Sequence, residues 1–318
     1  MKEHDLSGIK HFSKKAFVDF KTVVRNYLVA IQFLNHRGEI VNGSIIYELL
    51  IEPIMGFIEN HEVVVIHDSY SSDITLETVP VGLNLDGSPI YLIEKCTITN
   101  TFNLAADSYN NSCNYVSTFL GVSIMDSLSH SKDEANSLNE IIAIDSLIRR
   151  EGFTSNILLI NSEKARFFDC SNNPIRVMHW SSHFEKNEFS RNLNKLSVKS
   201  SNNYLYTETF QFLPNSFELV AFSSCNSLNL ISSNDLYSFD EGQINTIPIT
   251  KYIIVPLWKI YTPFAKYFYL RFYSTLIGQN FDYAKSLRET KLSFIHSGVY
   301  SHPLFWGGIQ LFKQYLPL

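Results

Sequence analysis

The sequence predicts an α/β protein whose mostly parallel sheet is covered by helices on both faces, preceded by a smaller α+β subdomain. From Tyr115 onwards, short apolar runs alternate with stretches of helical spacing, which is the pattern of parallel strands joined by helices. The first 112 residues follow a different order, with two helices ahead of several short strands. Hydrophobic residues make up 45% of the 318-residue chain, which is enough for a large core.

The N-terminal subdomain, residues 1–112, begins with two apolar stretches of helical spacing, at 10–34 and 45–60. Short strands are expected after them, with the turn signal Asp86-Gly87-Ser88-Pro89 between the last two. These strands cover 62–68, 80–87 and 88–102. The polar run "ADSYNNSCN" then marks a subdomain boundary, so residues 113–318 form the second unit.

The second unit contains five apolar runs that predict strands, at 115–125, 156–161, 175–182, 217–224 and 251–258. Helices are expected between and after them, at 133–152, at 162–170, from Thr262-Pro263 onwards and at 282–298. In sheets of this kind, ligands bind beyond the carboxyl ends of the strands. Residues that follow the strands are therefore the first candidates for a site.

The bulk composition excludes several classes of function. A net charge of −5 argues against nucleic acid as a direct partner. The start of the chain lacks the apolar region of a secretory signal, and the most aromatic segment is interrupted by charges and prolines, so no membrane partner is expected. The four cysteines lack disulfide or zinc spacing, and no strand is followed by a phosphate-binding or dinucleotide motif. We therefore expect a reduced, cytoplasmic protein without metal or cofactor.

A cysteine and a histidine lie where two predicted strands end. Cys225 follows the run "FELVAFSS", and His183 follows "IRVMHWSS", 42 residues earlier (225 − 183). If these two strands are neighbours, both side chains emerge from the same edge of the sheet. A nearby imidazole can take the proton of a thiol and favour the reactive thiolate. An incidental or packing role for both residues stays open on spacing alone.

The C-terminal stretch "YAKSLRETKLSFIHSGVYSHPLFWGGIQLF" resembles the end of the CHAT domain family, which are caspase-like proteins often found beside TPR repeats. The similarity lies in residues 286–290 and in His302-Pro303-Leu304-Phe305-Trp306. Further segments resemble motifs of that family in the same order along the chain: "IIYELLIEPI", "GSPIYLIEKCTITNTFN", "IRVMHWSSHFE", "FELVAFSSCNS" and "IIVPLWKIYTPFAKYFYLRFYSTLIGQ". Together they cover roughly residues 45–318.

The resemblance implies a caspase-like three-layer α/β/α sandwich and a cysteine endopeptidase with a Cys–His dyad. Carried over residue by residue, Cys225 is the nucleophile and His183 the general base. Their 42-residue separation is close to the roughly 50 residues typical of caspases. The backbone amides of Cys225 and Phe184 would form the oxyanion hole. His179 would orient the base or be an ordinary strand histidine, and Trp258 would wall the substrate cleft or belong to the core.

Two departures from the family pattern count against activity and keep an alternative function open. Phe184 and Leu228 stand where the family has glycine, a residue that permits close approach of the backbone or positive φ. Their side chains would narrow the cleft or misplace an oxyanion donor. The alternative is therefore a catalytically inactive pseudo-enzyme that binds a peptide or acts as a scaffold.

The resemblance also implies a substrate class and a partner. CHAT relatives suggest cleavage of a protein substrate after a basic residue, read by an acidic side chain. Asp235, Asp240 and Glu241, between the fourth and fifth strands, are the candidates. Activation is expected from a regulatory protein, with a TPR-containing protein as one candidate. The N-terminal subdomain would be a degenerate caspase half that completes the packing or docks this regulator.

Overall fold

The computed structural model describes residues 14–67, 75–101, 117–125, 132–161, 175–181, 198–200, 203–205, 217–223, 250–258 and 260–313. The α-helices within this part are α1 (Lys14–Gln32), α2 (His36–Ile46), α3 (Met55–Ile58), α4 (Leu92–Lys95), α5 (Lys132–Arg150), α7 (Thr262–Gly278), α8 (Tyr283–Ser297) and α9 (Pro303–Trp306). A π-helical segment, η1 (Tyr47–Ile51), and a 3₁₀ turn, η2 (Glu52–Ile54), connect α2 to α3, and a second 3₁₀ turn, η3 (Leu76–Thr78), precedes β2. The strands are β1 (Glu62–Ile66), β2 (Pro80–Leu83), β3 (Pro89–Tyr91), β4 (Thr97–Thr101), β5 (Ser117–Met125), β6 (Ser155–Asn161), β7 (Ile175–Ser181), β8 (Val198–Ser200), β9 (Asn203–Leu205), β10 (Phe217–Phe222), β11 (Thr250–Pro256) and β12 (Ile309–Lys313).

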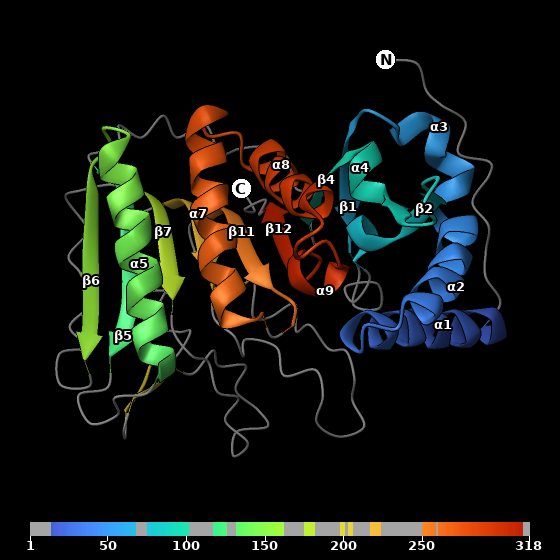
Figure 1. The fold of residues 1–318 in the computed structure, drawn as a ribbon, viewed down its shortest axis with the longest axis horizontal. Helices are drawn as coiled ribbons and strands as arrows, with labels where there is room; N and C mark the ends of the chain where they lie inside the picture. Colours follow the sequence, from blue (N-terminus) through green and yellow to red (C-terminus); the bar gives the residue numbers. More distant parts are fainter. Residues whose placement is uncertain are drawn as a thin grey trace.

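Eight of these strands form one sheet in the order β1-β4-β12-β11-β10-β7-β5-β6 (Figure 1). Only the β11–β12 pair is antiparallel among the pairs in this sheet of described strands. Strands β1, β4 and β12 therefore run in the direction opposite to the other five. The predicted α/β class, with a mostly parallel sheet flanked by helices, is confirmed.

The five strands from the second part of the chain have the order typical of doubly wound sheets. Taken in chain order as first to fifth (β5, β6, β7, β10, β11), they lie in space as 2-1-3-4-5. The order reverses between β5 and β7, and a reversal of this kind opens a crevice outside the carboxyl ends of the two strands. The fold thus places the expected binding crevice where β7 ends.

The core lies between this half of the sheet and helices α5 and α7, which lie side by side on one face (Figure 1). Alternate strand residues point to that face, so Phe119, Val177 and Leu219 are buried in one cluster with aromatic residues of α7. Gly121 lets α5 approach closely, because a Cβ at this position would lie 2.6 Å from the Ile141 side chain. Tight packing of α5 on the sheet follows from this one small residue.

The N-terminal part of the chain contributes β1 and β4 to the same sheet, so both parts of the chain share it. The expected boundary at 112/113 lies outside the described residues. Within the described residues, the helical stretch His36–Ile58 is long and apolar enough to cross a membrane by length and composition. That test alone is weak, since core helices of soluble proteins also pass it.

The expectation of one strand over residues 88–102 is wrong, since the helical turn α4 divides it into β3 and β4. Side chains stabilise this turn at both ends. Glu94 accepts a hydrogen bond from the Tyr91 backbone N–H at 2.7 Å, and Arg288 of α8 donates to the Ile93 carbonyl at 2.9 Å. A partner distant in sequence therefore helps to end the helix, by satisfying a carbonyl that the helix leaves free.

Candidate functional site

Strands β7 and β10 are adjacent and parallel, which is the condition that the Cys–His hypothesis required. Their register pairs Ala221 with His179 and Phe222 with Trp180, an offset of 42 residues (221 − 179 and 222 − 180). The two strands therefore end level with each other at the same edge of the sheet.

A row of serines lies at this edge, on three neighbouring strands. Ser123 of β5 pairs with Ser181 of β7, and the backbone N–H of Ser223 donates to the Trp180 carbonyl at 2.9 Å. The hydroxyls of Ser123 and Ser223 are buried and have no hydrogen-bond partner within the part of the chain that the structure describes. Buried hydroxyls without a partner are uncommon in folded proteins and ask for an explanation at each position. Here they lie beside the crevice that the topology predicts.

Most of the residues predicted for the site lie outside the described part of the chain. These are Cys225, His183, Phe184, Asp235, Asp240 and Glu241, together with Leu228. The described segments of β7 and β10 stop at Ser181 and Ser223, each two residues before a member of the predicted dyad. Only His179 and Trp258 of the predicted site residues can be placed.

His179 lies inside β7 and is completely buried. Its Nε2 atom lies 2.8 Å from a carboxylate oxygen of Glu140 on α5, and its Nδ1 atom lies 2.9 Å from the hydroxyl of Tyr273 on α7. A carboxylate can only accept, so Nε2 carries a proton. Burial raises the pKa of Tyr273 well above its usual value, so its phenol stays protonated. With both ring nitrogens engaged, His179 ties β7 to α5 and α7.

Sequence reasoning missed Glu140 and Tyr273. They lie 39 and 94 residues from His179, on helices whose spacing predicts the helix but not its contacts. The one signal in the sequence is a carboxylate directly before the apolar turn 141–144 of α5, and in the structure Glu140 is only 3% exposed. An acidic residue there needs a partner in the core.

Trp258 is buried in the core, at 6% exposure. Its indole N–H donates to the Leu304 carbonyl at 2.8 Å, and a Cβ on Gly308 would lie 2.5 Å from its ring. These contacts favour the packing role over a cleft wall. The ring of Trp258 therefore leaves no room for a residue larger than glycine at position 308.

Cys96 is the one cysteine among the described residues, and it is buried. Burial, with a smaller contribution from Glu77, raises the pKa of its thiol to about 11. A thiol with such a pKa is almost entirely protonated near neutral pH and makes a poor nucleophile. Cys96 is therefore not a candidate for the reactive cysteine.

Among the described residues, one group of side chains has the composition and proximity of metal ligands, namely His36, Glu39 and His302. It belongs to α2 and to the residue before α9, not to the β7–β10 edge.

Comparison with known proteins gives a family match and distant structural likenesses. The family model described as "CHAT domain" matches residues 42–314. No curated protein matches the chain. A secreted C11 cysteine protease from Bacteroides thetaiotaomicron, solved with an irreversible peptide inhibitor, is 15% identical with a TM-score of 0.35, over 57% of this chain and 59% of that chain.

Two other solved structures are similarly distant. The complex of the Porphyromonas gingivalis RgpB pro- and mature domains is 10% identical with a TM-score of 0.49, over 95% of this chain and 77% of that chain. The Saccharomyces cerevisiae separase–securin complex is 8% identical with a TM-score of 0.39, over 69% of this chain and 14% of that chain. This chain thus spans less than two thirds of the C11 protease chain and of the separase chain.

The family model covers far more than half of the sequence, and its range includes both strand ends described above. The motifs at 175–185 and 217–227 fall on the adjacent parallel strands β7 and β10 and on the residues after them. This chain belongs to the CHAT domain family and is a caspase-like CHAT domain.

Proposed function

We propose that the chain is a cysteine endopeptidase in which Cys225 is the nucleophile and His183 the general base. The observation that carries the proposal is the register of β7 and β10. Paired residues on these strands differ by 42, and Cys225 and His183 also differ by 42. If this register continued past Ser181 and Ser223, Cys225 would lie level with His183 beyond the carboxyl ends of two neighbouring strands, where ligands bind in such sheets.

The chemistry follows from these two residue types. His183 takes the proton of the Cys225 thiol, and the thiolate attacks the scissile carbonyl carbon. The backbone N–H groups of Cys225 and Phe184 stabilise the negative oxygen that forms. The C–N bond then breaks, and the leaving amine takes the proton from His183. Water, deprotonated by His183, hydrolyses the thioester and releases Cys225.

The substrate is a protein cut after a basic residue, with Asp235, Asp240 or Glu241 as the acidic reader of that residue. Family membership supports this part of the proposal, and so does the acidic composition of the segment between β10 and β11. Activation by a partner protein, with a TPR-containing protein as the first candidate, belongs to the same proposal.

The test is covalent labelling of the purified chain with peptidyl acyloxymethyl ketones that carry Arg, Lys or Asp next to the reactive group. Intact-mass spectrometry would compare the native chain with Cys225→Ala and His183→Ala, and Cys96→Ala is the matched thiol control. We expect a single adduct with the Arg or Lys probes, lost in the first two variants and retained in Cys96→Ala. Labelling at another cysteine would contradict the assignment of Cys225.

Peptide binding without cleavage is the second candidate function, favoured by Phe184 and Leu228 in place of the family glycines. In that case the native chain binds a basic peptide, measured by fluorescence anisotropy, but forms no adduct. The double substitution Phe184→Gly/Leu228→Gly would then restore labelling at Cys225. An adduct on the native chain would exclude this alternative.

A further inference from the structure

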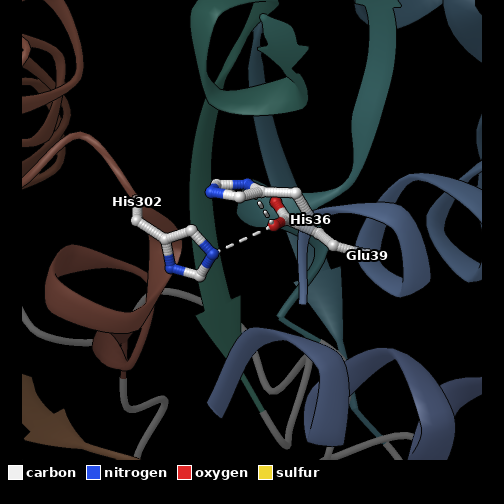
Figure 2. A group of neighbouring side chains, drawn as sticks. All are labelled: His36, Glu39 and His302. Carbon is white, nitrogen blue, oxygen red and sulfur yellow. Dashed lines mark ion pairs between the residues drawn. The ribbon is translucent and has the colours of Figure 1, made fainter. Parts of the chain in front are cut away.

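Three side chains from distant parts of the chain converge where α2 meets the start of α9 (Figure 2). Glu39 Oε2 lies 3.2 Å from Nε2 of His302 and 3.8 Å from Nδ1 of His36. The potential ligand atoms of the three residues all lie within 4.8 Å of one another. Glu39 and His302 are 263 positions apart (302 − 39), so only the fold brings them together.

The buried part of this group has unsatisfied polar atoms. The Glu39 side chain is completely buried, and that of His302 is 7% exposed. Glu39 Oε1 accepts a hydrogen bond from the Tyr91 hydroxyl at 2.9 Å, whereas Glu39 Oε2 and His302 Nε2 form an ion pair with each other but no hydrogen bond among the described residues. Burial raises the pKa of Tyr91 far above its usual value, with Glu39 as a further cause, so the phenol stays a donor. A buried carboxylate oxygen of Glu39 and a buried ring nitrogen of His302 thus lie close together, next to the exposed side chain of His36.

We propose that His36, Glu39 and His302 bind a Zn²⁺ ion. Two imidazole nitrogens and one carboxylate oxygen are a donor set that suits zinc, which accepts three protein ligands and leaves a fourth position open. The exposed ring of His36 gives the ion a route from solvent and places the fourth position there. Tyr91 orients the carboxylate from outside, as partners of metal ligands commonly do.

The hydrogen bonds of His302 show what binding would change. Its Nδ1 atom accepts a hydrogen bond from the Leu304 backbone N–H at 3.1 Å, at the start of α9. In the metal-free chain, the neutral ring therefore carries its proton on Nε2, directed at Glu39. Zinc needs the Nε2 lone pair, so the proton moves through solvent to Nδ1 and the Leu304 hydrogen bond breaks. One cap bond is thereby exchanged for a coordinate bond.

The ion would crosslink α2 to His302, the residue before α9, and so stabilise the folded chain. Binding to the folded chain but not to the unfolded chain raises the unfolding temperature, in proportion to the logarithm of free zinc above the dissociation constant. The site therefore has a readout that is independent of peptidase activity. It stands whether or not Cys225 is catalytic.

The test uses the full chain, stripped of metal, with Zn²⁺ alone as the probe. Affinity is measured by competition with a chromogenic chelator, and thermal unfolding is followed in parallel. His36→Ala is the main variant, because its side chain is exposed and the buried pair stays intact. His296→Ala is the matched control, since His296 is similarly exposed and pairs with one carboxylate, Glu94, at 3.4 Å.

We expect His36→Ala to weaken the tightest zinc binding more than about 100-fold and to abolish the rise in unfolding temperature, with His296→Ala unchanged. Tyr91→Phe should weaken binding about 10- to 100-fold, the range for outer partners of ligands. Zinc should also shift the His302 proton from Nε2 to Nδ1, seen in its ¹⁵N chemical shifts. Equal affinity in the native chain and His36→Ala, or an unchanged His302 tautomer, would leave only an ion pair here and overturn the proposal.

Discussion

The two halves of the sheet treat their buried polar residues differently. In the half formed by β1, β4 and β12, polar side chains are linked in one chain of contacts from β4 to α8. Asn100 donates to Gln310 at 2.9 Å, Gln310 donates to Glu77 at 3.0 Å, and Glu77 forms a buried ion pair with Lys291. In the other half, the buried hydroxyls of Ser123 and Ser223 have no hydrogen-bond partner among the described residues, as is also true of Thr99 on β4.

Each half also has a histidine just after a strand, but in a different setting. His67 follows β1, and its Nε2 atom lies 2.7 Å from the amide oxygen of Asn100, so it joins the linked contacts. In the sequence, His183 comes two positions after the last residue of β7, and the carboxyl ends of β1 and β7 lie at opposite ends of the sheet because the two groups of strands run in opposite directions. Satisfied polar contacts hold a structure in place, whereas unsatisfied ones are expected where function requires them. The linked contacts of the first half favour a stabilising role for it, and the proposed chemistry lies in the other half.

The largest expected effect concerns the assignment of chemistry to the β7–β10 half. In a chain that cleaves its substrate, Cys225→Ala should lower the cleavage rate at least about 10⁴-fold, because no other group there can form the thioester. Cys96→Ala, in the other half, should leave the rate within a few-fold of the native value. Cleavage assays under activating conditions would measure both. A similar loss of cleavage rate in both variants would show that the chemistry is not confined to the β7–β10 half.

The second prediction concerns the Lys291–Glu77 pair. Lys291→Met should lower the free energy of unfolding by about 3–5 kcal/mol, because it leaves a buried carboxylate without its counter-charge. The double variant Lys291→Met/Glu77→Gln should lose less than the sum of the two single losses. Urea denaturation of the four chains gives the comparison. A single-variant loss below about 1 kcal/mol would mean that this half does not depend on the pair.

The pH dependence of the same pair has a defined sign. Burial lowers the pKa of Lys291, and Glu77 opposes this only in part. Between the lowered pKa and the ordinary value of about 10.4, the unfolded chain binds more protons than the folded chain. The contribution of Lys291 to stability should therefore rise with pH through this window. Denaturation of the native chain and Lys291→Met across alkaline pH isolates this contribution, and a falling difference would contradict it.

The next, smaller effect concerns the reactivity of the Cys96 thiol. With its pKa raised to about 11, Cys96 should react with iodoacetamide at pH 8 roughly 100-fold more slowly in the folded chain than after unfolding. Peptide mapping by mass spectrometry would follow each cysteine separately. Fast labelling of Cys96 in the folded chain would show that the β4 region opens readily.

The smallest expected effect is that of Glu140→Gln. The amide oxygen can still accept a hydrogen bond from His179, so only the charge is lost and the cost should be about 1 kcal/mol. Glu140→Ala removes the acceptor and should cost about 1–3 kcal/mol. Chemical denaturation distinguishes the two. Equal losses would mean that the hydrogen bond to His179 contributes little.

The five strands of the β7–β10 half, namely β5, β6, β7, β10 and β11, could be predicted from sequence. Each is an apolar run bounded by polar residues, and a helical pattern or a polar stretch separates it from the next strand. Their neighbour relations follow the ordinary rule for alternating strands and helices. The placement of Cys225 and His183 came from strand ends and family resemblance together. The segments after β7 and β10, on which the proposed dyad lies, stay predictions.

Three features could not be predicted, and each depends on contacts between distant residues. The strand β12 is five residues long, and nothing local reveals that it inserts between β11 and β4. The turn α4 depends on Arg288, nearly 200 residues away. The approach of His302 to Glu39 requires α9 to lie against the N-terminal helices. Local patterns carry no information on such pairs.

The insertion of β12 determines when, during synthesis, the eight-strand sheet can form. Within the sheet, β12 is the only strand that joins the three-strand group to the five-strand group. Its residues, Ile309–Lys313, are the last described ones to leave the ribosome during synthesis. Earlier strands can pair within each group while the chain grows, but the two groups cannot share a sheet until this segment is available. Removal of β12 by proteolysis or early termination would therefore leave two partial sheets with newly open edges, a form prone to aggregation.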